Sequence, residues 1–211
     1  ADAQRYIADP EATPVPIAEL LSKEYAHQRR RLISQRAGVP APGAPWASDT
    51  VDLCTADDQG MMVSLIQSVF NDFGSGITIP GTGIVMQNRG SGFRLEPDHP
   101  NKLAPGKRPY HTIIPGFLTR DGVPVGPFGV MGGHMQPQGH VQMVVNTVDY
   151  GLDPQDALDA PRWFWESGRQ VKLEPQVNPE IASGLGARGH AISVEPDIDV
   201  FGGGQIIWRT H

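Results

Sequence analysis

The sequence of 211 residues contains a single cysteine, Cys54, and no apolar run approaches the length needed to span a membrane. One cysteine cannot form a disulfide within the chain, and its isolation excludes a cysteine-rich zinc site. The formal net charge of −6 does not favour a nucleic acid or an anionic membrane surface as a partner. These absences leave a globular domain, for which 211 residues provide a sizeable core.

The start of the sequence has neither an initiator Met nor the residue order of a signal peptide. Its first residues, ADAQRYIADP, are typical of the interior of a protein, so we expect the chain to be a piece of a longer or processed protein. Gly (25) and Pro (20) together make up about a fifth of the residues, above average usage. This composition favours short elements joined by many turns.

Apolar periodicity predicts an α+β layered domain. A moderately amphipathic helix is expected over 17–36, followed by an extended connector rich in Pro, Gly and Ala over 37–49. Two strands, 50–56 and 62–69, then form a hairpin. Further strands are expected on both sides of the turn 120–122, followed by helices over 135–150 and after Asp153-Pro154. The end alternates: strand 171–175, helix 178–189, strand 191–196 and strand 205–210.

The common catalytic motifs are missing. The seven histidines include no HExxH or HxxxH pair, so a metal site has little support. No GxSxG motif marks a serine hydrolase. The glycine-rich segments lack both the strand–GxGxxG–helix context and a following GK[ST], so most of these glycines are expected to serve turns.

Two features nevertheless suggest acyl-transfer chemistry. Thr50 follows the connector and begins a strand; if the Asp49–Thr50 bond were cleaved, its new α-amino group, with a pKa of about 7.7 to 8.0, could act as a base for its own hydroxyl. Gly132-Gly133 follows an apolar strand and precedes a helix, where its backbone N–H groups could form an oxyanion hole. Alternatively, Thr50 is only the first residue of an edge strand, and Gly132-Gly133 only forms a tight turn between a strand and a helix.

Four blocks of the sequence together resemble the γ-glutamyltransferase (γ-glutamyltranspeptidase) family of N-terminal nucleophile hydrolases: GTGIVMQNRGSGF, NKLAPGKRPYHTIIPGFLTRDG, VMGGHMQPQGHVQMVVNTVDYGL and DALDAPRW. The resemblance runs from about Thr50 to the C-terminus and covers the catalytic small subunit, so residues 50–211 form the predicted small-subunit region. Residues 1–49 resemble the end of the large subunit and its connector.

The resemblance implies a four-layer αββα sandwich, of which this chain supplies only part, and autocatalytic cleavage before Thr50. The expected partners are a small-molecule amide substrate and the missing large-subunit segment. Without that segment an apolar sheet face would be exposed, and homo-oligomers could form to cover it. No cofactor or metal is implied.

The family's catalytic positions map onto four residues. Thr50 corresponds to the nucleophile, and Ser68 to the second hydroxyl that hydrogen-bonds it. Gly132 and Gly133 correspond to the glycine pair that binds the oxyanion. The resemblance therefore implies an amidohydrolase or acyltransferase.

The substrate-binding positions depart from the family pattern. Phe70 replaces an Asn, while Arg89 and Gly92 replace a Gln and the Asp that binds the glutamyl α-amino group. The pair His111-Thr112 replaces two serines. A free-amino glutamyl group would lack its carboxylate partner here, at a cost of a few kcal/mol.

Arg89 suggests a different acyl group. An added cation would favour an acyl chain with an anionic tip and no ammonium, such as a glutaryl amide, as in the cephalosporin acylase branch of the family. The alternative is that Arg89 is a surface cation. A second possibility for the whole protein is a catalytically silent scaffold or an unprocessed precursor, because an intact Asp49–Thr50 bond leaves Thr50 without a free amine.

Overall fold

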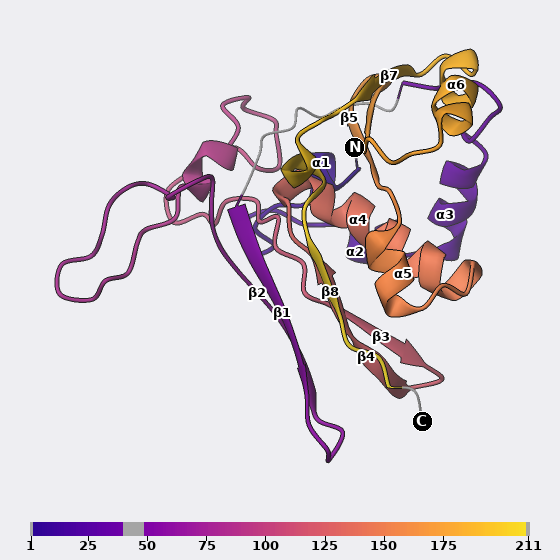
Figure 1. Cartoon of the computed structure of the whole chain (residues 1–211). Helices are drawn as coiled ribbons and strands as arrows, with labels where there is room; N and C mark the ends of the chain where they lie inside the picture. Colours follow the sequence, from indigo (N-terminus) through magenta and orange to yellow (C-terminus); the bar gives the residue numbers. More distant parts are fainter. Residues whose placement is uncertain (1, 40–48, 210–211) are drawn as a thin grey trace.

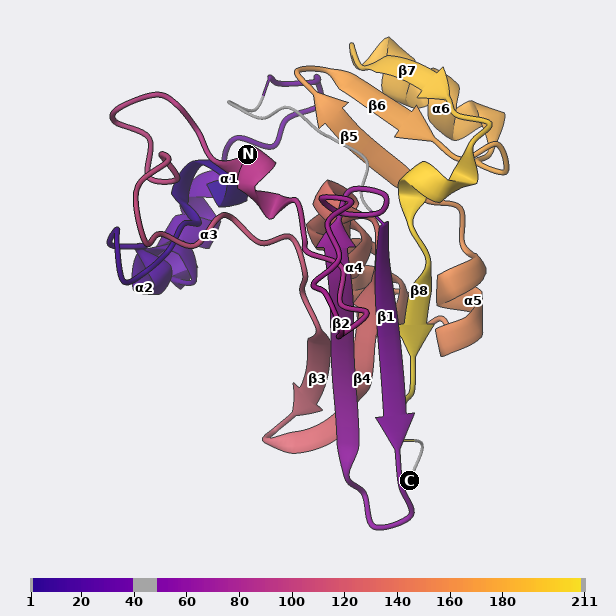
Figure 2. The same cartoon turned by 90° about the vertical axis from the view of Figure 1, so that its left-hand side faces the viewer.

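The computed structural model describes residues 2–39 and 49–209, so most of the predicted connector (37–49) lies outside the described residues. A two-stranded hairpin packs on a three-stranded sheet, and helices cover the opposite face of that sheet (Figure 1, Figure 2). A smaller sheet with its own helix lies at one end. The hairpin, the three-stranded sheet and the helices form three successive layers of an αββα sandwich. This arrangement confirms the predicted α+β class.

The hairpin consists of β1 (Asp49–Ala56) and β2 (Met62–Phe70), which pair antiparallel as predicted. Its side chains alternate between two faces. The face toward the three-stranded sheet carries the polar side chains Thr50, Asp52, Cys54, Ser64 and Ser68 together with the partly buried Met62 and Ile66. The Ser64 hydroxyl donates to the Phe128 carbonyl, and the Cys54 thiol lies 3.6 Å from the Gln205 carbonyl oxygen.

The outward face of the hairpin is apolar and exposed. It carries Val51, Leu53, Val63 and Leu65, of which Val51 is 63% exposed. Within residues 2–39 and 49–209 no helix covers this face (Figure 2). An uncovered apolar face of this kind requires another layer, which agrees with a chain that supplies only part of the sandwich.

The second sheet has the order β3-β4-β8, with β3 at Gly116–Arg120, β4 at Val123–Val130 and β8 at Gly204–Ile206. Helices α4 (Gln136–Val144) and α5 (Pro154–Asp159) pack on its far side. The core between them contains Phe128, Val130, Met143 and Ala157. Gly139 allows α4 to approach β4, because a Cβ atom there would lie 2.7 Å from a Val130 methyl carbon.

A helix was predicted over 135–150 with its valines inward, and this prediction is only partly right. The α-helix ends at Val144 and continues as a π-helical turn over Val145–Asp149. Val141 is 56% exposed and Val148 is 50% exposed. Val144 packs against the core, as predicted, but this side of the helix also carries glutamines, whose amides have backbone partners on a neighbouring strand.

That strand, β5 (Trp163–Ser167), was not predicted from the sequence. It pairs with β6 (Gln170–Leu173), which pairs in parallel with β7 (Ala191–Val194), and α6 (Pro179–Ala187) lies beside them. Gln138 bonds both the N–H and the C=O of Trp165, and Gln142 bonds those of Trp163. Two glutamines four residues apart on α4 thus satisfy the free edge of β5.

The N-terminal region is also more broken than predicted. In place of one helix over 17–36, α2 (Ile17–Leu20) and α3 (Lys23–Arg30) are separated at Ser22, and α1 (Asp2–Tyr6) precedes them. The Ser22 hydroxyl accepts the Tyr25 amide hydrogen as an N-cap, which begins a new helix and ends the old one. None of the described helices has the length and apolarity needed to cross a membrane.

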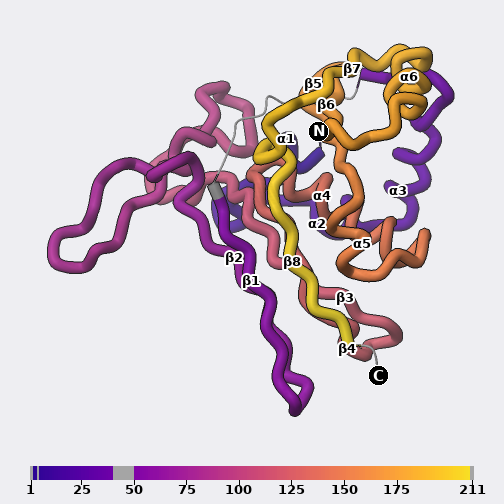
Figure 3. The backbone as a smooth tube through the Cα atoms, in the orientation of Figure 1, coloured from indigo at the N-terminus to yellow at the C-terminus, as the bar shows by residue number. Residues whose placement is uncertain are grey.

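A buried carboxylate, that of Asp9, is one of the groups that attach the N-terminal segment to the rest of the molecule. Asp9 is 5% exposed and accepts hydrogen bonds from the backbone N–H of Arg108 (2.9 Å) and from its guanidinium. These bonds hold the pKa of Asp9 below its ordinary value, against the effect of burial. By contrast, the segment between β2 and the 3₁₀ turn at Arg89–Gly92 projects away from the rest of the molecule (Figure 3).

Asp52 is the most unfavourable member of the hairpin's inward face. It is 5% exposed, and neither carboxylate oxygen accepts a hydrogen bond from the described residues. Burial raises its pKa to about 6, although the nearby Leu53 backbone N–H partly opposes this shift. The Asp52 carboxylate fits here because residue 129 is glycine: a Cβ atom on Gly129 would lie 2.3 Å from an Asp52 oxygen.

We predict that Asp52 makes stability fall as the pH rises. Between pH of about 4 and 6 the unfolded state loses this proton first, so folding becomes less favourable by up to about 3 kcal/mol. His140, whose pKa burial lowers to about 4, contributes the opposite slope. Comparing the free energies of unfolding of wild type and Asp52→Asn isolates the contribution of this carboxylate. In urea unfolding, the variant should become more stable relative to wild type as the pH rises from about 4 to 7. Asp58→Asn, in the exposed hairpin turn, should show no such gain; equal curves for wild type and Asp52→Asn would contradict the prediction.

Candidate active site

Thr50 lies at the start of β1 and faces the second sheet. It is 7% exposed, and its hydroxyl donates to the Ser68 hydroxyl on β2 at 3.2 Å. The Ser68 oxygen also accepts the Phe70 amide hydrogen at 2.9 Å. The antiparallel register places the two hydroxyls together because the strands pair near their open end, with a bulge between Asp49 and Val51.

Gly132 shares a cavity with this hydroxyl pair. Thr50, Ser68 and Gly132 line one cavity of about 790 Å³, which we call the nucleophile cavity. Its other lining residues are Val51, Gln67, Val69, Met131, Arg162, Ile198, Asp199, Gly202 and Gly203. Three of the four predicted catalytic residues are therefore brought together.

The fourth, Gly133, is buried and begins the 3₁₀ turn Gly133–Met135 that leads into α4. The φ angles of Gly132 and Gly133 are 121° and 56°. Such values are favourable only for glycine. The pair therefore forms the tight strand-to-helix turn considered as the alternative, and the same turn places the Gly132 backbone at the cavity.

A second glycine pair supports the first. The Met131 N–H donates to the Gly203 carbonyl at 2.9 Å, and a Cβ atom on Gly202 would lie 1.7 Å from the Met131 carbonyl oxygen. The two backbones are therefore in direct contact. The signal for this support in the sequence is the run Gly202-Gly203-Gly204, which was not assigned a role.

Arg162 holds the same glycine segment from the other side. Its guanidinium donates to the carbonyls of Phe201 (3.1 Å) and Gly202, and pairs with Glu174 at 2.9 Å. Arg162 is thus an ion-pair partner. Because both charges are largely buried, breaking the pair would leave an uncompensated charge next to the glycine segment.

His140 supports the last residue of β4. Its Nε2 accepts the Val130 amide hydrogen at 3.1 Å, which requires the neutral ring with its proton on Nδ1. Burial lowers the pKa of His140 to about 4, so this tautomer persists at neutral pH. α4 therefore stabilises the strand end from which Gly132-Gly133 extends.

The predicted substrate-binding residues do not form one group. Phe70 and Gly92 line a second cavity of about 290 Å³, which we call the aromatic cavity. Its other lining residues are Asn71, Ser91, Phe93, Arg94, His99, Asn101, Tyr110 and His134. His111 is exposed, and its Nδ1 lies 2.9 Å from the Pro109 carbonyl oxygen.

Arg89 and Thr112 form a buried pair behind Phe70. Arg89 is 1% exposed, so it is not the surface cation considered above. Its Nη1 donates to the Thr112 hydroxyl at 3.1 Å, its guanidinium carbon lies 5.0 Å from the centre of the Phe70 ring, and Nη2 has no partner among the described residues. Burial lowers the pKa of Arg89. Neither Arg89 nor Thr112 lines either cavity.

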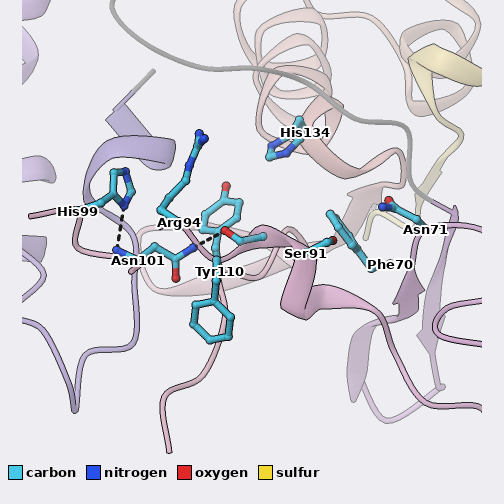
Figure 4. A pocket seen from close by; sticks show the side chains of 10 residues that line it. Phe70, Asn71, Ser91, Arg94, His99, Asn101, Tyr110 and His134 are labelled. Atoms are coloured by element: carbon cyan, nitrogen blue, oxygen red, sulfur yellow. Dashed lines mark hydrogen bonds between the residues drawn. The ribbon is translucent and has the colours of Figure 1, made fainter. Parts of the chain in front are cut away.

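The aromatic cavity extends from the end of β2 toward the loop after Gly92. Phe70 and Asn71 lie at one end and Arg94 and His99 at the other, with Tyr110 between them (Figure 4). The rings of Tyr110 and His134 stack at 6.0 Å between centroids. Apart from Phe70 and Gly92, the lining residues were not identified from the sequence. Among the described residues no group of three or more His, Cys, Asp or Glu side chains could hold a metal ion.

We predict that Gly202→Ala disrupts the site through the Met131 contact. Alanine at this position would have an unfavourable φ of 66°, and its methyl group would also clash with the Met131 backbone. The clash should lower the free energy of unfolding by at least about 2 kcal/mol beyond the cost of the φ angle alone. Gly83→Ala is the matched control, since its φ is 71° and the space around it is open. Urea unfolding should show a loss of about 1 kcal/mol for Gly83→Ala and a much larger loss for Gly202→Ala. Equal losses would show that the contact is not restrictive.

The comparisons with known proteins agree in identifying one family. The family model described as gamma-glutamyltranspeptidase matches residues 1–211. The glutathione hydrolase-like YwrD proenzyme of Bacillus subtilis (strain 168) is 36% identical over 94% of this chain and 38% of its own length. The oxamate amidohydrolase proenzyme of Klebsiella pneumoniae is 36% identical over 91% of this chain and 37% of its own length.

Among solved structures, a cephalosporin acylase from Bacillus halodurans superposes with a TM-score of 0.92 at 57% identity, over 99% of this chain and 38% of that one. The chain thus spans less than two fifths of the length of these relatives. The chain belongs to the gamma-glutamyltranspeptidase family.

Proposed function

We propose that this chain is the catalytic part of an amide hydrolase or acyltransferase whose nucleophile is Thr50, made N-terminal by cleavage of the Asp49–Thr50 bond. One observation carries the proposal: Thr50, Ser68 and Gly132 line the same cavity, although they come from three different strands or strand ends. The names of the relatives support amide hydrolysis as the reaction class, because they include an amidohydrolase and an acylase.

The reaction follows from the roles of these three residues. The Thr50 hydroxyl oxygen attacks the amide carbonyl carbon, and its proton passes to the Thr50 α-amine. The Gly132 region supplies backbone N–H donors to the tetrahedral oxyanion, a contribution typically worth about 10²–10³ in kcat per donor. The amine returns the proton to the leaving nitrogen as the C–N bond breaks. Water then attacks the Thr50 ester and releases the acid, while an amine acceptor would give transfer instead.

Ser68 positions the nucleophile. Its oxygen accepts both the Thr50 hydroxyl and the Phe70 amide hydrogen, so the orientation of Thr50 depends on the end of β2. An uncleaved chain has no free amine on Thr50 and therefore lacks the base, so we expect the precursor to be inactive. The remaining part of the proenzyme would cover the exposed face of the hairpin.

The preferred acyl group is proposed to be anionic at its tip, as in a glutaryl amide. Gly92 replaces the carboxylate that would pair with a glutamyl α-ammonium, and it lines the aromatic cavity. Of the residues that the structure describes, no acidic side chain lines this cavity, whereas Arg94 does, and the buried Arg89 lies behind Phe70. A positive site of this kind disfavours an ammonium and favours a carboxylate.

We predict that Thr50→Ala abolishes both autocleavage and turnover in the complete proenzyme, because it removes the attacking oxygen of both reactions. Thr55→Ala is the matched control, since Thr55 lies on the exposed face of the same strand. A denaturing gel and intact mass spectrometry report cleavage, and amide hydrolysis is measured in parallel. The control should show two pieces and full activity. Cleavage that persists in Thr50→Ala would remove Thr50 from the mechanism; wild type that stays uncut and inactive would favour a silent scaffold.

We also predict a preference between two acyl donors of the same length. The matured enzyme should hydrolyse a glutaryl anilide with a kcat/KM at least about tenfold above that of the γ-glutamyl anilide, because the added ammonium has no partner and meets Arg94. Steady-state kinetics on the two substrates at one pH tests this. A clear preference for the γ-glutamyl anilide would contradict the proposed acyl specificity but not the amide hydrolysis itself.

A further inference from the structure

One loop supplies half of the residues that line the aromatic cavity. Residues 93–110, which we call the cavity loop, contribute Phe93, Arg94, His99, Asn101 and Tyr110 (Figure 4). The cavity loop contains neither a helix nor a strand. Its backbone instead closes on itself, because the Arg94 N–H donates to the Asn101 carbonyl at 2.9 Å and the Leu103 N–H donates to the Arg94 carbonyl at 2.8 Å. A contact that holds one part of the cavity loop therefore holds several cavity residues at once.

The cavity loop is held mainly by polar contacts with the N-terminal segment. Its leucines do not anchor it, since Leu95 is 83% exposed and Leu103 is 60% exposed, and neither belongs to a buried cluster of the described residues. Tyr110 stacks on His134. Within residues 2–39 and 49–209, the hydrogen bonds of the cavity loop to parts of the chain beyond its flanking residues go to residues 9–13.

Asp9 makes the strongest of these contacts. Its side chain is 3% exposed, and it accepts three hydrogen bonds from Arg108: from the backbone N–H at 2.9 Å, from Nη2 at 3.1 Å and from Nε at 3.3 Å. One carboxylate thus binds both the backbone and the forked guanidinium of the same residue. Because charge-assisted bonds of this kind are strong and directional, they fix the position and the orientation of the cavity loop at Arg108.

Thr13 extends the same contact to the cavity wall. Its hydroxyl donates to the Pro100 carbonyl at 3.2 Å, and the Lys107 ammonium donates to both the Thr13 hydroxyl and the Pro100 carbonyl. Pro100 precedes Asn101, which lines the cavity and whose side-chain nitrogen donates to the Gly92 carbonyl at 2.8 Å. Residues 9–13 are therefore connected to the cavity wall through a continuous series of hydrogen bonds.

We infer that Asp9 is a positioning residue for the aromatic cavity and acts on it through Arg108 from the other side of the cleavage site. Asp9 itself lines neither cavity, so its effect on a substrate is indirect. The inference rests on the proposed function, because cleavage of the Asp49–Thr50 bond would place Asp9 and Arg108 on different polypeptides. The N-terminal piece is then needed for turnover as well as for maturation, since it holds the loop that shapes the cavity.

The test measures cleavage and the hydrolysis of glutaryl p-nitroanilide by the complete proenzyme. Asp9→Ala should raise KM at least about tenfold and change kcat less than about threefold, because it displaces groups that position the substrate. Cleavage before Thr50 should stay complete. Asp9→Asn should have a smaller effect, since it keeps an acceptor for the Arg108 N–H, and it replaces Asp9→Ala if that variant does not fold. Glu11→Ala is the matched control: Glu11 pairs with the same guanidinium at 2.7 Å but is 82% exposed, so its loss should leave KM unchanged.

Hydrogen exchange measured by mass spectrometry separates this inference from the proposed function, because it does not depend on turnover. Peptides from residues 93–110 should exchange at least about tenfold faster in the Asp9 variant than in wild type, whereas peptides from residues 50–70 should not change. If wild type hydrolyses no anilide but exchange changes in this way, the positioning role stands and the catalytic proposal fails. Unchanged exchange in the cavity loop, an unchanged KM in an active Asp9→Ala enzyme, or an equal effect of Glu11→Ala would each overturn the inference. Faster exchange that extends equally to the hairpin would also overturn it.

Discussion

The site depends on how closely the β1–β2 hairpin packs on β4. Gly129 on β4 leaves the space that the Asp52 carboxylate occupies, and Gly202 leaves the space for the carbonyl of Met131. With any larger residue at either place, the two sheets or the two glycine segments would separate. Because Thr50 and Gly132 come from opposite sides of this contact, their common cavity exists only while the sheets stay in contact.

This close contact leaves an unpaired carboxylate on the inward face of the hairpin. That face holds hydroxyls and Asp52 together with the partly buried Met62 and Ile66, while Val51, Leu53, Val63 and Leu65 face outward and are exposed. Burial of the inward face therefore gains less than burial of a wholly apolar face, and covering the outward face is expected to add stability.

The hairpin that carries Thr50 and Ser68 could be predicted from the sequence, because strand alternation and a turn are local patterns. The pairing of the two hydroxyls was implied only by the family resemblance. The role of α4's glutamines could not be predicted, because their partners are on β5, an unpredicted strand more than twenty residues away. The aromatic cavity joins side chains from β2, from the loop after Gly92 and from the glycine turn. No short sequence motif predicts that these side chains lie together.

Phe70 joins the two halves of the site. Its amide hydrogen bonds the Ser68 hydroxyl, and its ring contacts the Arg89 guanidinium and forms part of the aromatic cavity. It does this at φ 83°, which is unfavourable for a bulky side chain. Such strain persists only where the surroundings hold the residue firmly. Since one strained residue contacts both the Ser68 hydroxyl, which accepts the Thr50 hydroxyl hydrogen, and the interior of the aromatic cavity, a substitution at Phe70 is expected to alter both places at once.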